Sequence, residues 1–385
     1  MFGVEDGFDI VIGNPPHGAN IENIKNKIQN IYKFYEKRKN SASLFLELAY
    51  ILLKKQGITC FVIPKSFTFV SSWKKIRNFV LFDNQLLFVV DISKAFENVK
   101  LEQVLLAYKK VKLDRNYEFK TGDYWAEEIK IISFSNTELS KRLDLIPVYI
   151  DNKKLNIFNK IIKNSVLLSQ ISKTLRGLPF QRKVIPNGKI PILRGNNLGK
   201  YIIYGVVPKI NLSESETQNK KLRLLKQKKI VSQNIVAHVM NPFDRIIVMA
   251  TLDNEGYLTL DTVMNTFITD PSFNYFYILG ILNSRLSEWF YYWFVYNRAI
   301  RTMHFDKYYM GKLPIKKITS QNKPIVQEIE ELVDTIITLT QSGEYLEDKG
   351  KQAQVKEYEK QIDQLVYKLY DLTPEEIDLI EKNVS

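Results

Sequence analysis

The chain is poor in the residues that build metal centres and covalent cross-links. Among its 385 residues it has one cysteine and three histidines. A single cysteine, Cys60, excludes a disulfide framework and a cysteine-built zinc site. The histidines, His17, His238 and His304, lie far apart in the sequence. We therefore predict no metal centre.

Long uninterrupted hydrophobic runs are also missing. The most apolar stretch, residues 276–296, is interrupted by Asn283, Arg285 and Glu288, whereas a membrane-spanning helix needs roughly 20 predominantly apolar residues. Residues 2–9 are acidic and lack the basic start of a secretory signal. We therefore expect a cytoplasmic chain with no membrane partner, and a buried helix at residues 276–296.

Acidic residues are in the minority. The chain has 55 Lys and Arg against 42 Asp and Glu, which gives a net charge of +13, and 45% of its residues are hydrophobic. That hydrophobic fraction is ordinary for a globular protein, and the basic excess points towards a polyanionic partner without identifying it. The length suits two or three domains at roughly 100–200 residues each.

The first 115 residues predict an α/β sheet. Apolar runs typical of strands alternate with stretches of helical spacing, and glycine or proline ends most of them. The runs are residues 8–12, 58–63, 86–92 and 104–108. Alternation of strand and helix is typical of a mostly parallel sheet, in which we expect residues 8–12 to form a buried strand.

The rest of the chain changes character twice. Residues 116–164 are rich in charged residues and asparagine, which favours a connector. Residues 165–320 contain short β-like runs broken by glycine, proline and asparagine, and we predict a separate, mainly β or α+β domain there. Residues 321–385 carry two apolar helical stripes and a capping box at residues 373–376, which predict C-terminal helices.

The segment with the clearest chemistry follows the first strand and reads Gly13-Asn14-Pro15-Pro16-His17. Open α/β sheets bind ligands at the carboxyl ends of their strands, and the two prolines make this turn rigid. The Asn14 side-chain oxygen and the Pro15 carbonyl can together accept both hydrogens of one –NH2 group, which favours a more nucleophilic nitrogen. The alternative is a plain turn, because Asn-Pro opens many turns.

This turn is similar to the Asn-Pro-Pro-aromatic motif of the amino-methyltransferases. The order of the later motifs resembles that in TaqI-like N6-adenine DNA methyltransferases and type IIG restriction–modification enzymes. These motifs are residues 43–57, 96–108, 279–284 and 312–315. The resemblance covers nearly the whole chain. It implies a partial Rossmann-like methyltransferase sheet in residues 1–115, a target-recognition domain in residues 165–320, double-stranded DNA as partner and S-adenosylmethionine as cofactor.

The resemblance also implies roles for individual residues. The turn at residues 14–17 would be catalytic, with His17 in the place of the aromatic residue that stacks on a flipped adenine. Phe45 matches an aromatic residue that lies against the adenine of the cofactor. Tyr108 matches a second residue that stacks on the target base. For both Phe45 and Tyr108, an ordinary core position is the alternative.

Two features depart from the family pattern. His17 stands where Tyr, Phe or Trp is usual, and its smaller ring offers less area for stacking. The 16 glycines form no Gly-x-Gly, and only 13 residues precede Asn14, so the glycine-rich cofactor loop is missing. The resemblance therefore implies cofactor binding only together with an N-terminal half of the methyltransferase domain. Either a partner chain supplies that half, or this chain is a truncated product of a longer gene.

Loops of the predicted target-recognition domain carry candidates for contact with DNA. Lysine and arginine contact phosphates, while arginine, asparagine and glutamine read base edges. The candidates are Arg176, Gln181, Arg182, Arg194, Asn196 and Asn197. For each of them the alternative is a solvated surface side chain.

The leading hypothesis is the adenine-N6 methyltransferase portion of a restriction–modification system, in which we find no convincing nuclease motif. One alternative is a non-catalytic, sequence-specific DNA-binding protein with a degenerate methyltransferase remnant, which His17 and the missing glycine loop favour. A second alternative is a methyltransferase acting on a protein glutamine or on RNA, because Asn-Pro-Pro also suits an amide. The long downstream domain argues against the second alternative.

Overall fold

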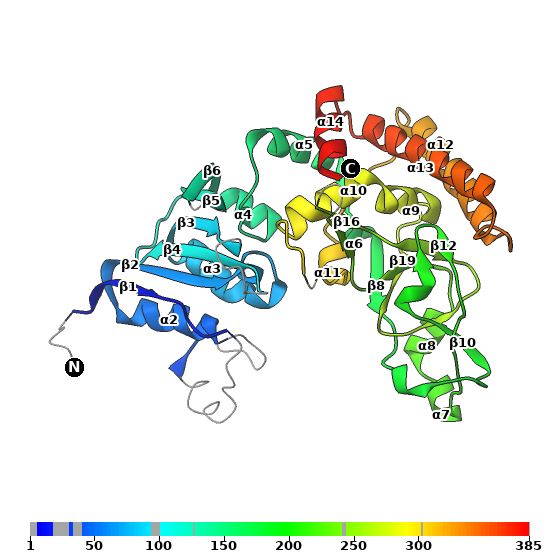
Figure 1. The fold of residues 1–385 in the computed structure, drawn as a ribbon, viewed down its shortest axis with the longest axis horizontal. Helices are drawn as coiled ribbons and strands as arrows, with labels where there is room; N and C mark the ends of the chain where they lie inside the picture. Colours follow the sequence, from blue (N-terminus) through cyan, green and yellow to red (C-terminus); the bar gives the residue numbers. More distant parts are fainter. Residues whose placement is uncertain are drawn as a thin grey trace. The chain divides into compact units, whose positions relative to one another are not determined.

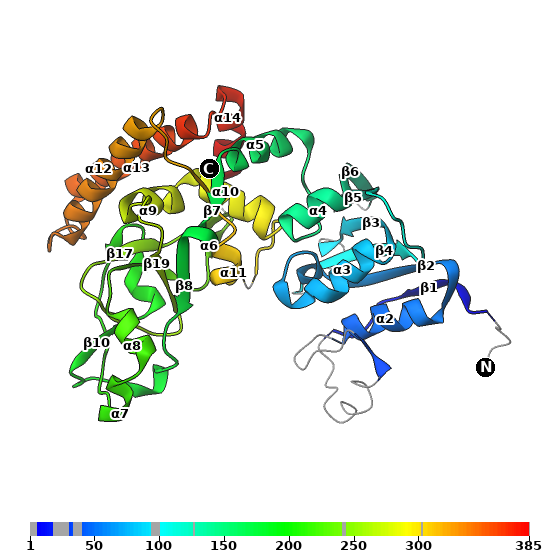
Figure 2. The same ribbon diagram turned by 180° about the vertical axis from the view of Figure 1, so that it is seen from behind.

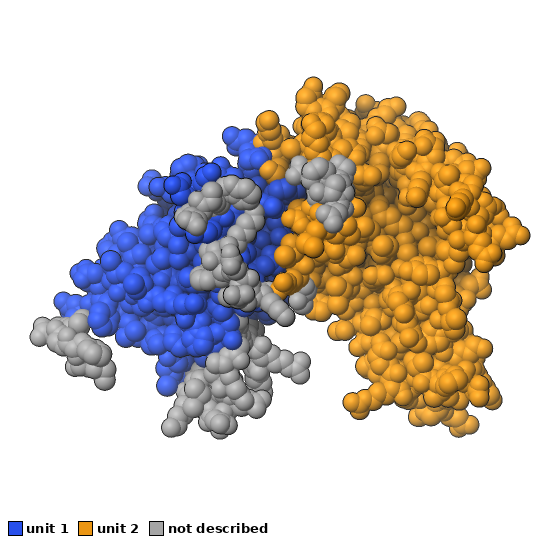
Figure 3. Space-filling model, viewed as in Figure 1, with its two compact units in different colours: residues 1–152, 293–299 blue, residues 153–292, 300–385 orange. Residues whose placement is uncertain are grey.

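A computed structural model describes residues 6–17, 31–33, 41–93, 101–125, 128–240, 244–301 and 303–384. The chain divides into two compact units, which Figure 3 shows in different colours. Unit 1 comprises residues 1–152 and 293–299, and unit 2 comprises residues 153–292 and 300–385.

Unit 1 is built on a six-stranded sheet with the order β1-β2-β4-β3-β5-β6 (Figures 1 and 2). Its strands are β1 (Phe8–Gly13), β2 (Leu53–Pro64), β3 (Gln85–Asp91), β4 (Gln103–Lys109), β5 (Glu118–Trp125) and β6 (Glu128–Asn136). Its helices are α2 (Ala42–Leu52), α3 (Lys74–Phe82) and α4 (Thr137–Leu143). They pack against β2, β3 and β6 respectively.

The sheet of unit 1 is mixed, so the prediction of a mostly parallel sheet is wrong. β1 pairs with β2 in parallel, and β3 pairs with β5 in parallel. β4 runs antiparallel to both of its neighbours, and β5 and β6 form an antiparallel pair. An apolar run reports the burial of a strand but carries no information about its direction.

The sheet also extends beyond residue 115. β5 and β6 lie within the segment that was expected to be a connector, and they form one end of the sheet. β6 is an edge strand whose first five residues are exposed, and charged residues such as Glu128 and Lys130 are tolerated there. Frequent charged residues here therefore reflect an exposed hairpin.

β1 forms the opposite end of the described sheet, where its one strand neighbour is β2. The strand itself is where the sequence predicts it, but the expected burial is wrong, because Ile10 is 63% exposed and Ile12 is 75% exposed. An edge strand presents unpaired backbone N–H and C=O groups, and exposed apolar side chains on such an edge favour pairing with another segment.

Residues 293–299 belong to unit 1 although they lie far along the sequence. Asn297 is fully buried at φ 53°, a backbone conformation that asparagine tolerates well. Its amide donates to Thr68 Oγ1 at 2.9 Å and to the Ile146 carbonyl at 2.8 Å, and its oxygen accepts from the Val148 N–H at 3.1 Å. One side chain thus joins three segments of unit 1.

Unit 2 combines small, mostly antiparallel sheets with helices (Figure 1). The two larger sheets have the orders β17-β14-β19-β8 and β18-β10-β13-β9. The strands are β7 (Ser165–Leu167), β8 (Ser172–Arg176), β9 (Val184–Ile185), β10 (Ile190–Leu193), β11 (Leu198–Gly199), β12 (Ile202–Ile203), β13 (Lys209–Ile210), β14 (Lys229–Gln233), β15 (Ala237–Val239), β16 (Arg245–Ile247), β17 (Ala250–Asp253), β18 (Leu258–Thr259), β19 (Val263–Ile268) and β20 (Pro314–Lys316).

The helices of unit 2 are α5 (Asn152–Ile162), α6 (Leu168–Ile171), α7 (Glu214–Thr217), α8 (Lys220–Leu225), α9 (Tyr275–Asn283), α10 (Arg285–Phe290), α11 (Lys307–Met310), α12 (Lys323–Gln341), α13 (Lys349–Leu369) and α14 (Pro374–Val384). The apolar stretch at residues 276–296 is buried as predicted, but it is divided into α9, α10 and a π-helical turn, Tyr291–Val295. No helix in the described ranges is long and apolar enough to cross a membrane.

The C-terminal helices pack within unit 2. α12 contacts both α9 and α13, and a Cβ on Gly280 of α9 would lie 2.7 Å from the Ile329 side chain. The predicted capping box is confirmed, because the Thr373 N–H donates to Glu376 Oε2 at 2.8 Å and the Glu376 N–H donates to Thr373 Oγ1 at 3.4 Å. The β region and the C-terminal helices therefore share one compact unit.

We expect Asn297→Ala to lower the free energy of unfolding by about 2–4 kcal/mol, because it leaves buried backbone groups without partners. Asn297→Gly tolerates the positive φ and should still lower stability. Chemical denaturation of the purified chain measures both effects. Asn152→Ala, at an exposed asparagine, is the control and should change stability by less than about 0.5 kcal/mol. Equal denaturation midpoints for all three variants would contradict the assignment.

Candidate functional site

The turn predicted to hold an amine follows β1 at the edge of the sheet. Asn14 comes directly after Gly13, the last residue of the strand. Pro15 is buried, and the Pro16 carbonyl accepts a hydrogen bond from Ser41 Oγ at the start of α2. The Asn14 side chain is exposed and makes no hydrogen bond with the described residues. The prolines therefore fix the turn, while the Asn14 amide stays available to a ligand.

His17 and Phe45 lie beside this turn. Burial lowers the pKa of the His17 imidazole from its usual value, so the ring is neutral at neutral pH. Both ring nitrogens are buried and have no hydrogen-bond partner among the described residues. Phe45 lies one turn into α2, whose first turn the Ser41 bond holds next to Pro16, and its ring is 36% exposed. Phe45 is therefore partly open to a ligand.

The structure corrects the role predicted for Tyr108. Its side chain is fully buried, and its hydroxyl donates to the Leu46 carbonyl at 2.7 Å. Tyr108 lies near the end of β4, opposite Thr59 in the middle of β2, and Thr59 in turn pairs with Val11 of β1. A ring that is buried in the core and held by its hydroxyl is not open to stacking on a base. Residues 96–100 of the same predicted motif lie outside the described residues.

A buried charged cluster lies at the carboxyl ends of β2 and β3. Lys65 Nζ contacts Asp91 Oδ2 at 2.8 Å and Glu102 Oε1 at 3.2 Å, and it donates to the Arg298 carbonyl at 3.1 Å. The Tyr149 hydroxyl donates to Asp91. Burial favours a higher pKa for Asp91, but Lys65 and the hydrogen bonds lower that pKa to about 2. Asp91 is therefore ionised and fully paired, which makes the cluster a support for this edge of the sheet.

Two predicted DNA contacts, Arg176 and Gln181, meet at Asp261 in unit 2. Arg176 Nε donates to the Asp261 carbonyl at 2.7 Å, and Arg176 Nη2 lies 3.6 Å from Asp261 Oδ2. Gln181 Nε2 donates to Asp261 Oδ1 at 3.3 Å. No sequence signal indicated Asp261, because the residues lie 85 and 80 positions apart along the chain.

Three further candidates remain on the surface of unit 2. Gly195 donates its N–H to Thr262 Oγ1 at 3.0 Å, so the residues on either side of it, Arg194 and Asn196, lie beside the Asp261 turn. Asn196 is exposed, and Arg194 is partly buried. Arg182 is exposed, as expected for a residue that could contact a phosphate.

Asn197 has a different role from the one predicted. It is only 4% exposed, and its amide donates to the carbonyls of Tyr204 at 3.0 Å and Val206 at 3.2 Å. Its side-chain oxygen accepts from the Arg194 N–H at 3.1 Å. Because these bonds occupy the side chain, Asn197 holds the shape of its own loop and is not available to read a base.

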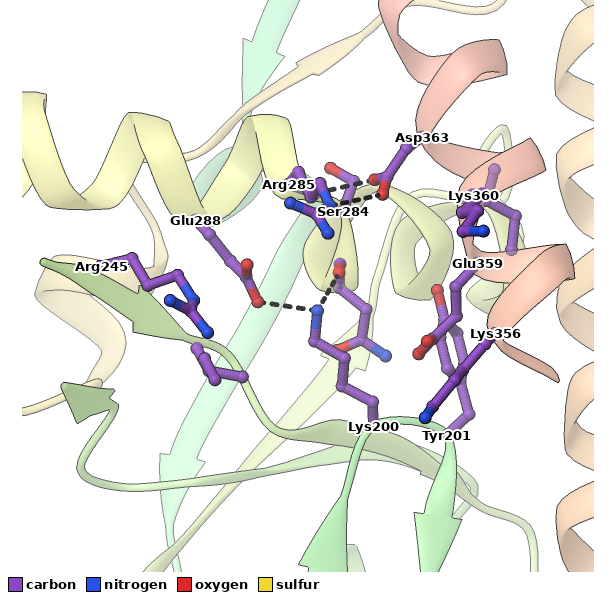
Figure 4. Close-up of a pocket in the computed structure, with 13 residues that line it drawn as sticks. Lys200, Tyr201, Arg245, Ser284, Arg285, Glu288, Lys356, Glu359, Lys360 and Asp363 are labelled. Atoms are coloured by element: carbon purple, nitrogen blue, oxygen red, sulfur yellow. Dashed lines mark hydrogen bonds and ion pairs between the residues drawn. The ribbon is translucent and has the colours of Figure 1, made fainter. Parts of the chain in front are cut away.

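A pocket of about 640 Å³ lies between the β11–β12 turn, β16, α10 and α13 (Figure 4). The Lys200 side chain reaches towards Glu288, with Nζ 2.7 Å from Glu288 Oε1, and donates to the Asn283 carbonyl at 2.9 Å. Asp363 Oδ1 accepts from the Arg285 N–H at 2.8 Å. The Lys200 contacts anchor the hairpin that follows Asn197 to α9 and α10, and the Arg285–Asp363 bond joins α10 to α13.

Comparison with known proteins agrees with this architecture. Residues 1–97 match the family described as Eco57I restriction-modification methylase, and residues 190–315 match the TaqI-like C-terminal specificity domain. The chain thus carries a segment similar to a restriction–modification methylase followed by one similar to a TaqI-like specificity domain, which confirms the resemblance seen in the sequence.

Particular relatives carry the same description. A protein of Methanocaldococcus jannaschii that bears the name "Putative type II restriction enzyme and methyltransferase RM.MjaORFECS2P" is 24% identical over 413 residues, which cover 97% of this chain and 32% of that protein. The type II restriction enzyme and methyltransferase RM.Eco57I of Escherichia coli is 26% identical over 169 residues, 40% of this chain and 16% of that protein. The chain therefore spans about a third or less of the length of these relatives.

Among solved structures, the type IIL restriction–modification enzyme MmeI in complex with DNA matches with a TM-score of 0.58 and 12% identity. The match covers 97% of this chain and 56% of that chain. At this identity the likeness shows a shared fold.

We expect the free energy of unfolding of unit 2 to decrease by about 1 kcal/mol between pH 6 and pH 8. Burial raises the pKa of Asp363 to about 7 in the folded chain, whereas the unfolded carboxyl has already lost its proton in this range. Stability that protonation provides below pH 7 is thus lost as the pH rises. Urea unfolding at both pH values measures the difference.

Asp363→Asn should flatten this pH dependence. Asp378→Asn is the matched control, because Asp378 is 57% exposed and pairs with Lys382 on the same helix. An unchanged slope in Asp363→Asn would show that another group carries the dependence.

Proposed function

We propose that this chain is the target-amine and DNA-specificity part of a restriction–modification DNA methyltransferase. The reaction moves a methyl group from S-adenosylmethionine to N6 of an adenine rotated out of the duplex. The observation that carries the proposal is the rigid Asn14–Pro15 turn at the carboxyl end of β1, with an exposed amide and no competing hydrogen bond in the described chain.

The turn offers two acceptors to one amine. Asn14 Oδ1 and the Pro15 carbonyl accept the two hydrogens, and this draws the nitrogen lone pair out of conjugation with the ring. Acceptors fixed before the reaction stabilise the positive charge that develops on nitrogen in the transition state. The methylated amine then loses its proton to water, so the site needs no general base.

The aromatic side chains beside the turn fit the two adenines of such a reaction. His17 is neutral, because burial lowers its pKa, and it can therefore stack on the target base without adding a positive charge. Phe45, with its partly exposed ring, would lie against the adenine of the cofactor. S-adenosylmethionine supplies the electrophilic methyl group when bound, and the missing Gly-x-Gly means that another segment holds its methionine part.

The open edge of β1 is where that segment would dock. Ile10 and Ile12 on β1 are 63% and 75% exposed. Large apolar side chains exposed on an edge strand are costly in water and favour strand addition. The occupant is the N-terminal methyltransferase segment, either as a separate chain or as part of a longer protein.

We expect Asn14→Ala to reduce adenine methylation by about 10²–10³-fold, because it removes one of the two acceptors. The assay combines the chain with a segment that carries a glycine-rich cofactor loop and follows methyl transfer to duplex DNA. DNA affinity should change little. Asn152→Ala, at an exposed asparagine away from the turn, serves as control.

Full methylation by Asn14→Ala would exclude the amine cradle. Site-specific DNA binding without methylation under any complementation would instead favour the non-catalytic specificity protein, which His17 and the absent glycine loop also favour.

We expect Ile12→Asp to abolish complementation by the N-terminal segment. The free energy of unfolding of the isolated chain should change by less than about 0.5 kcal/mol. The side chain is 75% exposed in this chain and would be buried in the assembled sheet. Recovery of methylation and co-purification with the segment measure the effect. Phe134→Asp is the matched control, because Phe134 is exposed on the opposite edge strand. Equal complementation by both variants would place the docking surface elsewhere.

A further inference from the structure

The end of β8 passes unusually close to the turn at residues 259–262. A Cβ on Gly177 would lie 2.1 Å from the Leu260 carbonyl oxygen and 2.5 Å from the Thr259 carbonyl oxygen, so a larger residue would push the two segments apart. The Leu178 N–H donates to the Thr259 carbonyl at 2.7 Å, and the Asp261 N–H donates to the Leu178 carbonyl at 2.8 Å. This backbone pairing fixes Asp261 opposite Arg176.

Asp261 holds the Arg176 guanidinium by one edge. Nε donates to the Asp261 backbone carbonyl, and the carboxylate lies near Nη2 at 3.6 Å, which is too long for a hydrogen bond. The hydrogens of Nη1 and Nη2 therefore make no hydrogen bond with the residues that the structure describes. The Arg176 side chain is 55% exposed, so this free end of the guanidinium is accessible to a ligand.

Two parallel N–H groups at the end of a fixed arginine match the O6 and N7 acceptors of guanine in the major groove. An arginine that contacts a phosphate needs no such restraint, because a phosphate accepts hydrogen bonds from many directions. Restraint of Nε lowers the rotamer entropy lost on binding and sets the plane of the guanidinium. The arrangement thus favours base reading over phosphate contact.

The local charge remains suitable for DNA. Asp261 alone would repel phosphates, but Arg176 and Lys221 lie beside it, and Lys221 Nζ donates to the Gly177 carbonyl at 2.9 Å. The three side chains leave a net positive charge. Asp261 can therefore position Arg176 without making this surface repel a polyanion.

We propose that Arg176 reads the guanine of one G·C pair in the recognition site and that Asp261 is its positioning residue. The inference rests on the proposed function, because it requires the specificity domain to bind duplex DNA.

Selection of duplexes from a randomised library by the full 385-residue chain, followed by sequencing, tests the assignment. The unsubstituted chain should enrich a motif with at least one strongly preferred G·C pair. Arg176→Ala should lose the preference at one such position by about tenfold or more, with the other positions unchanged. Asp261→Asn should weaken the preference at the same position by less than Arg176→Ala does, because it removes the charge near Nη2 but leaves the backbone carbonyl that accepts from Nε.

Arg223→Ala is the matched control, because Arg223 is an exposed arginine on α8 in the same unit. It should lower affinity at most uniformly and leave the motif intact. An unchanged motif in Arg176→Ala, with or without a loss of stability, overturns the inference and leaves the proposed function standing. Enrichment of no motif by the unsubstituted chain overturns both.

Discussion

The parallel pairing of β1 with β2 is the contact on which the proposed amine site depends. Its register sets Ile12 opposite Cys60 and Gly13 opposite Phe61, so Asn14 leaves the sheet at the edge where β2 also approaches its end. Parallel strands bring their carboxyl ends to a single edge. The ion pair of Lys65 and Asp91 lies at the carboxyl ends of β2 and β3, and the Ser41 hydroxyl at the start of α2 holds the Pro16 carbonyl of the turn.

Features encoded by neighbouring residues could be predicted from the sequence. The first strand and the capping box at Thr373 depend on side chains within a few positions of each other, and both were located correctly. The order of the methylase motif and the specificity domain was also predictable, since the family motifs are short and occur in sequence. Local chemistry therefore identified the architecture and the turn that carries Asn14.

Features set by distant partners could not be predicted. The Tyr108 ring is buried and its hydroxyl donates to the carbonyl of Leu46, 62 positions away, a contact that an apolar run does not reveal. Asn197 has a side chain suited to reading a base, but its amide donates to the carbonyls of Tyr204 and Val206, seven and nine positions further along the chain. Asp261 and Lys65 became recognisable only when the fold brought their partners together. The burial of β1 was overestimated because the hydrophobicity of a strand does not tell whether neighbouring strands lie on both of its sides.

The contribution of residues 293–299 to unit 1 affects any exchange of specificity modules between related enzymes. The chain passes between the units three times, after residues 152, 292 and 299. If everything beyond residue 152 were replaced by the corresponding part of a related enzyme, residues 293–299 would be replaced too. The new segment would then have to bind Thr68, Ile146 and Val148 of unit 1 in place of Asn297. Chimeras that keep the native residues 293–299 preserve these hydrogen bonds, whereas a chimera with a single junction at residue 152 does not.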